Sequence, residues 1–474
     1  MRSTQSARKK LHAHFIGIGG IGISALARWF LAKNWAVSGS DIAGSSVTQE
    51  LEKEGVKVKI GHKKGGPACR QAGLPSRVDM VVFSEAIEPQ NPELIEAKRR
   101  GIVPLSYPQA LGCLTKAYKT LAVTGSHGKS TTTAMLALIL IRAGFDPNVV
   151  IGTKLKEFGG KNFRSGKSKL LVLEADDYKA VFLNYSPAAI IATTLDREHL
   201  DVYKNLGNIK KAFLKFFAKI KNGGALVVNR DDKNLRSLHS PIARLAKRNS
   251  LRVLWYSLKS PEAKQIRNVL KIPGEHNVSN AIAAYTLATK ILNIKKQDAL
   301  KALAGYRGAW RRMEFRGYYS LPPTPYRLPV YDDYAHHPTE IKATLEAFKE
   351  KFPKRKIICV YQPHQGERLK ALYPEFIHSF HDADTLILLP VYEVAGRDTR
   401  YKTWTSERLA ASIKKRYPKK EVYYISNPER IKEFLRSHLP PPTYYLLPIL
   451  IMMGAGDIAN YTPLLLDKKR KRAV

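Results

Sequence analysis

The amino-acid sequence predicts an α/β protein of about three domains, in which largely parallel strands alternate with helices. The chain has 474 residues, whereas a single domain holds roughly 100–200. Short apolar runs alternate with longer amphipathic runs along most of the chain, as in repeated βαβ units. Two glycine-rich turns, at 17–22 and 125–128, each stand between an apolar run and a helix, which is where α/β domains bind nucleotides. We therefore expect domains at residues 1–116, 117–316 and 317–474.

The first domain is predicted to be Rossmann-like. Its first strand leads into Gly17-x-Gly19-x-x-Gly22, a helix at 23–33, and a second strand at 36–40 that ends at Asp41. This order of glycines, helix and acidic residue is typical of domains that bind NAD or another ligand containing a pyrophosphate. Both ligands remain open, as does a glycine-rich turn without a ligand. Further predicted strands lie at 56–60, 80–83 and 102–105, with a helix at 91–100.

The second glycine-rich turn is the centre of the predicted second domain. The segment 120–141 reads as a strand (121–123), a loop (124–129) and an apolar helix. Gly125 and Gly128 permit close approach of the backbone to an anion, Lys129 adds a positive charge, and Ser130 offers a hydroxyl to Mg²⁺. Val123 stands where the strict phosphate-loop pattern has its first glycine, so the loop is a variant, G-x-x-G-K-S. The segment favours a nucleotide site over an ordinary turn.

Polar residues follow three successive predicted strands of this domain. Glu174 follows the strand at 169–173, the sequence TTLDREHLD with His199 follows 188–192, and Asn229 follows 225–228. The ends of parallel strands meet at one edge of a sheet, so Glu174 is expected to hold Mg²⁺ beside the phosphate loop. A ligand role and a structural role for His199 are equally supported. We interpret residues 254–271 as a polar connection.

Two later segments each allow two interpretations. Asn277 and Asn280 stand near a predicted helix start beside His276. Capping of the helix is favoured for the two asparagines over recognition of a base. Arg311 and Arg312 are adjacent, so their side chains point apart and one of them can reach a cleft as a phosphate clamp. A solvated basic loop is the favoured interpretation of this pair.

The third domain is predicted to open with a strand at 330–331 and the turn DDYAHHP, residues 332–338. Pro338 is suited to the first turn of a helix. The turn brings together five polar or titratable residues, which favours a functional role: Asp332, Asp333, Tyr334, His336 and His337. Further predicted strands lie at 357–361, 385–389, 422–425 and 446–453, with a helix from about 406.

Composition argues against several classes of protein. The formal net charge is +39, but Lys and Arg are spread along the whole chain and no RNA- or DNA-binding motif is present, so we expect no specific nucleic-acid partner. No apolar run is long enough for a membrane span, and the basic N-terminus reaches glycines where a signal peptide needs apolar residues. We therefore expect a cytoplasmic protein. Cys69, Cys113 and Cys359 stand far apart and indicate inert thiols.

Together, these motifs resemble those of the Mur ligase family. In the family's order and spacing the chain contains HFIGIGGIGISALA, SGSD, GSHGKSTTTAM, EADD, EHLD, PGEHNVSNA, RRMEF, DDYAHHPTEIKATL, YQPH and GAGDI, from about His12 to Ile458. GIGGIG and DDYAHHPTE resemble the members that join L-alanine to UDP-N-acetylmuramate. The resemblance implies three domains: an N-terminal Rossmann-like domain for the UDP moiety, a central P-loop-type, ATPase-like domain with a mixed sheet, and a C-terminal Rossmann-like domain for the amino acid.

The resemblance also implies the residues of each site. For UDP-N-acetylmuramate they are Gly17, Gly19, Gly20, Gly22, Asp41, His62 and Ser84. For ATP they are Gly125, Ser126, His127, Gly128, Lys129, Ser130 and Thr131 at the phosphates, His276, Asn277 and Asn280 at the adenine, Arg311 or Arg312 at the γ-phosphate, and Asp332 at the ribose. For Mg²⁺ they are Ser130, Glu174 and His199, and for the amino acid they are Tyr334, His336, His364 and Arg368. The adenine assignment overrides the capping interpretation.

The implied reaction belongs to peptidoglycan precursor synthesis. The lactyl carboxylate of UDP-N-acetylmuramate attacks the γ-phosphate of ATP, and the amine of L-alanine then attacks the resulting acyl phosphate. Mg²⁺, Lys129 and an arginine, Arg312 or its neighbour, neutralise the charge that moves during transfer. His199 is implied as a metal ligand, and His336 is a candidate base for the ammonium proton. The resemblance leaves a monomer or a homodimer open.

The chain departs from the family's pattern at several positions. Ser126 and Ser130 replace threonines and keep the hydroxyls. Residues 193–199 read TTLDREH where the family has TNIEADH, which places Arg197 near the proposed metal. Gln365 replaces one of two arginines expected for the amino-acid carboxylate, so glycine or L-serine could replace L-alanine as the acceptor. A ligase for a recycled tripeptide and a weakened nucleotide-binding homologue also remain open. The segment 254–271 is shorter than usual and predicts a reduced central sheet.

Overall fold

The computed structural model describes residues 10–61, 74–320, 326–393, 403–438 and 447–467. The predicted ligand residue His62 and the cysteine Cys69 lie outside these ranges. The chain forms two compact units. Unit 1 comprises Met1–Leu195, Lys210–Ser257 and Ala281–Leu303, and unit 2 comprises Asp196–Ile209, Leu258–Asn280 and Ala304–Val474.

Unit 1 begins with a parallel five-stranded sheet of order β3-β2-β1-β4-β5, which confirms the predicted Rossmann-like domain. Its core is formed by apolar residues of β1 and β4 with α1 and α3, such as Phe15, Leu26 and Leu94. The elements are β1 (His12–Ile16), α1 (Ile21–Ala32), β2 (Ala36–Asp41), α2 (Ser46–Lys53), β3 (Lys57–Ile60), β4 (Met80–Phe83), α3 (Pro92–Arg99), β5 (Leu105–Ser106) and α4 (Tyr107–Ala117).

The central sheet has seven strands in the order β12-β11-β10-β6-β9-β7-β8. Only β8 runs antiparallel to its neighbour, so the predicted mixed sheet is confirmed. Its elements are β6 (Lys119–Thr124), α5 (Lys129–Arg142), β7 (Asn148–Leu155), η2 (Lys156–Phe158), β8 (Lys161–Arg164), β9 (Leu170–Glu174), η3 (Tyr178–Asn184), β10 (Ala189–Ala192), α6 (Leu200–Tyr203), α7 (Leu206–Phe217), β11 (Ala225–Asn229), α8 (Lys233–Arg236), α9 (His239–Arg248) and β12 (Arg252–Tyr256).

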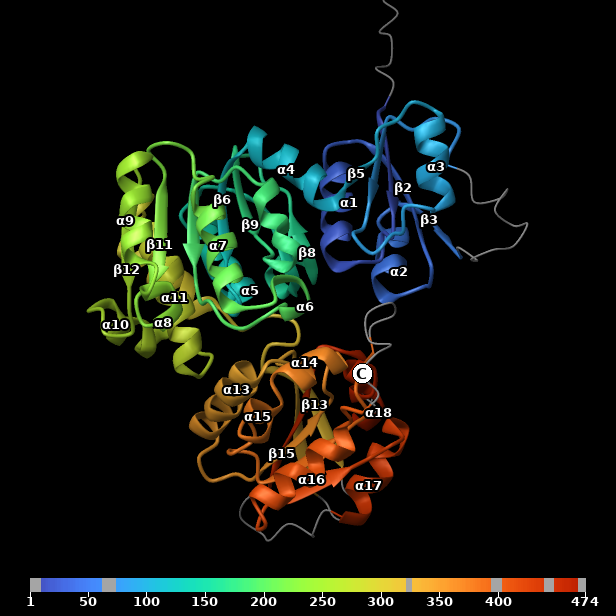
Figure 1. Cartoon of the computed structure of the whole chain (residues 1–474), viewed down its shortest axis with the longest axis vertical. Helices are drawn as coiled ribbons and strands as arrows, with labels where there is room; N and C mark the ends of the chain where they lie inside the picture. Colours follow the sequence, from blue (N-terminus) through green and yellow to red (C-terminus); the bar gives the residue numbers. More distant parts are fainter. Residues whose placement is uncertain (1–9, 62–73, 321–325, 394–402, 439–446, 468–474) are drawn as a thin grey trace, which may run out of the picture. The chain divides into compact units, whose positions relative to one another are not determined.

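Within unit 1, helix α1 contacts both sheets. It covers β1 and β2 of the first sheet and also packs against β7 and β8 at the edge of the central sheet. In Figure 1, α1 stands between the blue first sheet and the green strand β8. Helix α5 packs across β6, β9 and β7, and its residues from Ser130 to Ala137 are all buried.

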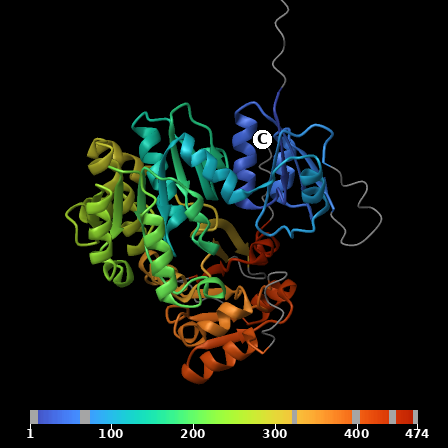
Figure 2. The ribbon, with the colours of Figure 1, turned by 45° about the horizontal axis from the view of Figure 1, so that its top comes forward.

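Unit 2 holds a third sheet of order β13-β14-β18-β15-β16-β17, in which only β13 is antiparallel. Figure 2 shows this sheet in orange and red with helices packed around it. Alternate residues of each strand enter two different cores, for example Cys359 on one face and Val360 on the other. The elements of unit 2 are α10 (Glu262–Val269), the first half of α11 (Glu275–Thr286), β13 (Glu314–Ser320), β14 (Arg327–Asp333), α13 (Pro338–Lys351), β15 (Ile357–Tyr361), α14 (Gly366–Ala371), α15 (Tyr373–Ile377), β16 (Thr385–Leu388), α16 (Ser406–Arg416), β17 (Glu421–Tyr424), η5 (Pro428–Arg430), α17 (Ile431–His438), β18 (Ile449–Met453), η6 (Asp457–Asn460) and α18 (Thr462–Leu465), together with α6. The second half of α11, η4 (Leu287–Ile291) and nearly all of α12 (Lys296–Gly305) belong to unit 1.

Three details differ from the sequence-based expectations. Residues 254–271 are not a polar connection, because they hold the end of β12 and the whole of α10, whose Ile266 is fully buried. The predicted strand at 102–105 is reduced to two residues, 105–106. The predicted boundary after residue 316 falls inside β13, a strand of the third sheet.

The remaining expectations concern membrane spans and cysteines. Among the described residues, no helix is long and apolar enough to cross a membrane. Cys113 and Cys359 are free thiols, and burial of Cys359 raises the pKa of its thiol. A buried, protonated thiol is unreactive.

Candidate functional site

The phosphate loop lies between β6 and α5, as predicted. Gly128 is the residue before the helix and has φ 81°, and Gly125 has φ 144°. A Cβ atom at Gly125 would lie 2.0 Å from Thr193 Oγ1, so only glycine fits this position. The three hydroxyl-bearing residues Ser126, Ser130 and Thr131 are buried.

Two threonines that follow β10 hold the loop in place. Thr193 Oγ1 donates a hydrogen bond to the carbonyl of His127 at 2.6 Å. The hydroxyl of Thr194 accepts one from the N–H of His127 at 2.8 Å, and its carbonyl accepts one from the N–H of Ser126 at 2.9 Å. Neither threonine was predicted to belong to the site, although their position at the end of a neighbouring strand was the available signal.

Lys129 occupies the centre of the loop. Its ammonium group donates to the carbonyl of Gly125 at 2.7 Å and to Asp177 Oδ1 at 2.7 Å. Burial lowers the pKa of Lys129, but Asp177 and Asp176 outweigh it and the net shift is upward, so the group is a fixed positive charge. Asp177, which is 1% exposed, was not among the predicted site residues despite its place in the EADD segment.

The predicted metal ligands Ser130 and Glu174 lie side by side in unit 1. Ser130 Oγ donates to Glu174 Oε1 at 2.9 Å, and the N–H of Gly152 donates to Glu174 Oε2 at 2.6 Å. Burial raises the pKa of Glu174, while Gly152, Lys129 and Ser130 oppose that rise. A buried carboxylate beside a hydroxyl is the oxygen donor set that Mg²⁺ prefers, so these residues fit the ion. His199 lies in unit 2 with φ 53°, and its role as a third ligand remains a prediction.

The glycine-rich turn of the first domain lies at the carboxyl edge of its sheet. The N–H of Gly19 donates to Asp41 Oδ2 at 2.7 Å, so the acidic residue of the motif holds the turn itself. A Cβ at Gly17 would lie 3.0 Å from Ser84 Cβ, which places the predicted residue Ser84 against the same turn. Gly20 is the residue before α1. The structure therefore brings together the described members of this predicted set.

In unit 2, a buried ion pair forms around Arg368. Its Nε is 3.1 Å from Glu198 Oε1, and the two side chains are 9% and 5% exposed. Burial alone would raise the pKa of Glu198, but the guanidinium of Arg368 outweighs it and holds that pKa well below its usual range. Arg368 Nη1 also lies 3.1 Å from His364 Nδ1. Glu198 was not predicted, although it directly precedes His199.

A small cavity in unit 2 adjoins this pair. Its lining includes Arg197, Glu198, His199, Gln365 and Arg368. The guanidinium of Arg197 pairs with Glu375 at 2.9 Å, and both side chains are partly exposed. Gln365 has φ 68°. Two of the positions at which the chain departs from the family's pattern, Arg197 and Gln365, therefore line one cavity.

The predicted base His336 is a neutral imidazole. Its Nδ1 lies 3.1 Å from the carbonyl of Tyr334 and 3.2 Å from Glu340 Oε2, two acceptors that place the proton on Nδ1. Burial lowers the pKa of His336 to about 4. The ring therefore keeps a free lone pair on Nε2 at neutral pH. Its centroid is 5.5 Å from that of Tyr334 and 6.0 Å from that of His364.

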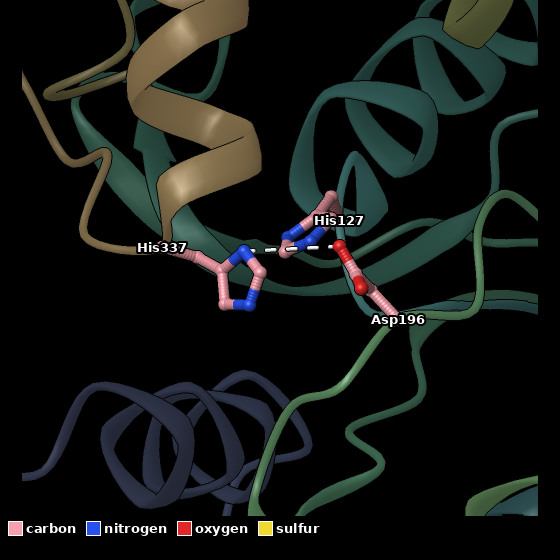
Figure 3. Close-up of side chains that lie close together, drawn as sticks. All are labelled: His127, Asp196 and His337. Carbon is pink, nitrogen blue, oxygen red and sulfur yellow. Dashed lines mark ion pairs between the residues drawn. The ribbon is translucent and has the colours of Figure 1, made fainter. Parts of the chain in front are cut away.

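His337 has a structural role at the start of α13. Its Nδ1 accepts a hydrogen bond from the N–H of Thr339 at 3.2 Å. Asp196 Oδ2 lies 3.7 Å from the same nitrogen and accepts a shorter bond, 2.7 Å, from Thr339 Oγ1. Figure 3 shows Asp196 and His337 with the dashed line that joins them. The pair secures the turn that carries His336.

The two adjacent arginines have different roles. Arg311 is 5% exposed, and its guanidinium donates to the carbonyls of Gly454 and Gly456. Arg312 has a side chain that is 31% exposed, and its Nη1 is 3.9 Å from Glu340 Oε1. Arg311 therefore acts as a structural brace in unit 2, and the contact of Arg312 with a γ-phosphate remains a prediction.

Asp332 is more buried than a ribose ligand requires. It is 1% exposed, accepts a 2.6 Å hydrogen bond from Thr462 Oγ1, and lies 3.1 Å from Arg316. Burial raises its pKa to about 6. This geometry favours a structural role, and contact with a ribose remains a prediction.

The predicted adenine segment is the first part of α11. Asn277 lies inside the helix and donates from its amide to the carbonyl of Pro273 at 2.7 Å, so it is not the capping residue. Asn277 and Asn280 are buried, at 6% and 7% exposed. Burial and the nearby Arg312 lower the pKa of His276 to about 4. The segment thus holds neutral, partly shielded polar groups.

The comparisons with known proteins cover nearly the whole chain. Three family patterns match in order: the Mur ligase family catalytic domain at residues 12–119, the Mur ligase middle domain at 123–288, and the Mur ligase glutamate ligase domain at 311–447. A protein of Aquifex aeolicus named UDP-N-acetylmuramate–L-alanine ligase is 36% identical, over 94% of this chain and 95% of that protein. One of the same name from Acetivibrio thermocellus is 37% identical, over 98% and 97%.

Solved structures agree with these matches. A UDP-N-acetylmuramate-alanine ligase from Thermotoga maritima superimposes with a TM-score of 0.73 at 25% identity, and covers 96% of this chain and 98% of its own. A murein peptide ligase from Psychrobacter arcticus has a TM-score of 0.65 at 22% identity, again over 96% and 98%, and supports the fold alone. With its sheets, its phosphate loop and these matches along nearly its full length, the chain belongs to the Mur ligase family.

Proposed function

We propose that this chain catalyses the ATP-dependent joining of L-alanine to the lactyl carboxylate of UDP-N-acetylmuramate, a step of peptidoglycan precursor synthesis. The observation that carries the proposal is the array of Lys129, Ser130 and Glu174 at the end of the central sheet. The names of the relatives that match over nearly their full length support the choice of substrates.

The residues of unit 1 are suited to bind ATP as its magnesium complex. Lys129 would bind the β- and γ-phosphates in exchange for its bond to Asp177. Ser130 and Glu174 would hold Mg²⁺, which when bound supplies positive charge for the transferred phosphoryl group. The N–H groups of the loop and the start of α5 add donors for the same anion.

The proposed reaction has two steps. The lactyl carboxylate attacks the γ-phosphorus, ADP leaves, and an acyl phosphate forms. The amine of L-alanine then attacks the acyl carbon and phosphate leaves, which forms the C–N bond. The ammonium group must lose a proton first. His336 is the predicted acceptor and carries a lone pair on Nε2, but its pKa of about 4 makes it a weak base for that proton.

A phosphate-release assay tests the proposal. The protein is supplied with ATP, Mg²⁺ and UDP-N-acetylmuramate, and L-alanine, glycine, L-serine or a tripeptide is added in turn. We expect release that depends on the nucleotide sugar and is fastest with L-alanine. Release only with the tripeptide would identify a recycling ligase, and no acceptor-dependent release with any of them would contradict ligase activity.

The preference among amino acids depends on the cavity beside Arg368. Glu198 neutralises the guanidinium of Arg368. Gln365, which lines the same cavity, supplies an uncharged amide where a second arginine is usual in the family. We therefore expect a weaker contact with the amino-acid carboxylate, seen as a high KM for L-alanine. Gln365→Arg should lower that KM, with no change in the KM for ATP.

A further inference from the structure

Tyr107 stands between the two ligand edges of unit 1. It follows β5 directly and is the first residue of α4, the helix that leads from the first sheet to the central one. Helix α4 packs against η3, the segment that comes after the carboxylates at the end of β9. The helix is therefore held by β5 of the first sheet and by η3 of the central domain.

The packing of α4 is close enough to fix the position of Tyr107. A Cβ at Gly112 would lie 2.6 Å from the carbonyl oxygen of Asn184. The N–H of Ser186 donates to Thr115 Oγ1 at 3.0 Å. This close backbone contact and this hydrogen bond, both with the segment 184–186, leave α4 little freedom to shift.

The ring of Tyr107 lies over the start of α1. A Cβ at Gly22 would lie 3.0 Å from the Tyr107 hydroxyl oxygen and 3.0 Å from Cζ. The third glycine of the GxGxxG turn is thus required by the tyrosine ring, which occupies the space of a side chain there. The phenol group therefore lies beside the N–H groups at the start of a helix, where a phosphate binds.

The hydroxyl of Tyr107 is available to a ligand. No described residue forms a hydrogen bond with it. Burial, followed by the charges of Asp176 and Glu174, raises its pKa, so it stays protonated and can donate. Between a pyrophosphate at the first edge and carboxylates at the second, a neutral donor adds attraction for the phosphate without adding charge.

We propose that Tyr107 is a substrate-positioning residue that donates a hydrogen bond to a pyrophosphate oxygen of the nucleotide sugar. The proposal rests on the proposed function, because that function supplies the ligand. A bound pyrophosphate fixed at this point directs the sugar and its lactyl carboxylate toward Lys129 and Glu174.

The test compares Tyr107→Phe with the parent protein in two measurements. Binding of UDP-N-acetylmuramate and of UDP alone is measured by calorimetry without ATP, and kcat and KM are measured by phosphate release. We expect the dissociation constants of both nucleotides to rise roughly 10- to 100-fold, the loss of one hydrogen bond to a charged group. The KM for UDP-N-acetylmuramate should rise by a similar factor, with no change in the KM for ATP.

Two controls separate this role from a structural one. The melting temperature of Tyr107→Phe should equal that of the parent, because the hydroxyl has no partner among the described residues. Tyr118→Phe, at the other end of the same helix, should leave both dissociation constants unchanged.

The outcomes are distinct from those of the proposed function. Unchanged binding of both nucleotides by Tyr107→Phe, or weaker binding of UDP-N-acetylmuramate but not of UDP, would overturn the contact with the pyrophosphate. A parent protein that binds neither nucleotide would instead refute the proposed function, before any variant is measured.

Discussion

Lys129 forms a 2.7 Å ion pair with the buried Asp177, so its replacement affects both activity and folding. We expect Lys129→Ala to reduce phosphate release by roughly 10²–10³-fold, the usual effect of losing one group that stabilises transferred charge. The exposed Lys221→Ala serves as the matched control and should retain full activity.

Lys129→Ala also leaves the buried carboxylate of Asp177 without its positive partner. An unpaired buried charge destabilises the folded protein. The double variant Lys129→Ala with Asp177→Ala removes both charges and should recover most of the lost melting temperature without recovering phosphate release. Substantial activity in either variant would contradict the assignment of the loop.

His336 links stability to pH. Its pKa is lowered from 6.5 to about 4 by burial. Between these values the unfolded chain binds a proton that the folded protein does not, so the free energy of unfolding falls as pH drops from 6.5 toward 4. We expect His336→Gln to remove about 2–3 kcal/mol of that fall, measured by urea unfolding at pH 7 and pH 4.5.

Other groups titrate in the same range. The pKa of His276 is also lowered to about 4 and acts in the same direction, whereas the pKa of Asp332 is raised to about 6 and acts in the opposite one. Both are present in the parent and the variant, so the difference between the two proteins isolates His336. Parallel stability curves would show that His336 is not the group that titrates.

At the scale of elements, the phosphate loop is fixed by packing against the end of β10. A Cβ at Gly125 would lie 2.0 Å from Thr193 Oγ1, and φ is 144°. Gly125→Ala should therefore cost at least about 3 kcal/mol of unfolding free energy, from strain and displacement together. It should also abolish phosphate release, because the loop cannot keep its shape.

Gly144→Ala is the matched control for this variant. Gly144 also has a positive φ, 80°, but a Cβ there meets no atom within 4 Å. Its replacement should cost only about 1 kcal/mol and leave activity unchanged. Equal effects of the two replacements on unfolding would mean that the contact with Thr193 does not constrain the loop.

The elements that the sequence predicted well are those with a strong local signal. Apolar runs bounded by turn residues located most strands to within a few residues, as at 80–83 and 357–361. Residues 254–271 were misjudged because β12 is only partly buried and α10 is polar on its exposed side. A polar edge strand followed by a short helix lacks the hydrophobic period on which the prediction depends.

Only those residues of the candidate site that lie in local sequence motifs could be predicted. Lys129, Ser130 and Glu174 lie in recognisable segments and come together in the structure. Glu198, the buried partner of Arg368, was missed because the two residues are far apart in the chain. The structural role of Arg311 depends on two glycine carbonyls more than 140 positions away, which no local pattern indicates.

At the scale of the whole molecule, a cluster of charged residues joins the two sheets of unit 1, and no sequence motif indicated it. Arg28 on α1 is 3% exposed and donates to Glu54 at 3.1 Å and Glu50 at 3.2 Å, both on or beside α2. Its Nη1 also donates to Asn162 on β8 at 2.6 Å. Lys154 on β7 pairs with Glu50 at 2.6 Å. This Arg28 cluster joins the first sheet's helices to the central sheet.

Loss of the Arg28 cluster should weaken the joint between the two sheets of unit 1. Arg28→Met keeps most of the buried side-chain volume but leaves Glu54 and Asn162 without their donor. We expect the free energy of unfolding to fall by roughly 2–4 kcal/mol, because Arg28 and its partner Asn162 are buried whereas its partner Glu50 is partly exposed. Differential scanning calorimetry should show the first domain melting in an earlier, separate transition.

The control is an arginine in an exposed pair. Arg430→Met removes a pair with Glu433 in which both side chains are about two-thirds exposed, and it should leave the melting temperature unchanged because solvent screens an exposed pair. Arg28→Met should also affect catalysis, because the Arg28 cluster holds the first sheet against the central sheet. The glycine-rich turn would no longer be held at a fixed distance from the phosphate loop, so kcat should fall more than ATP affinity. A single, unshifted transition in Arg28→Met would show that apolar packing of α1 on β7 and β8 is sufficient to hold the two sheets together.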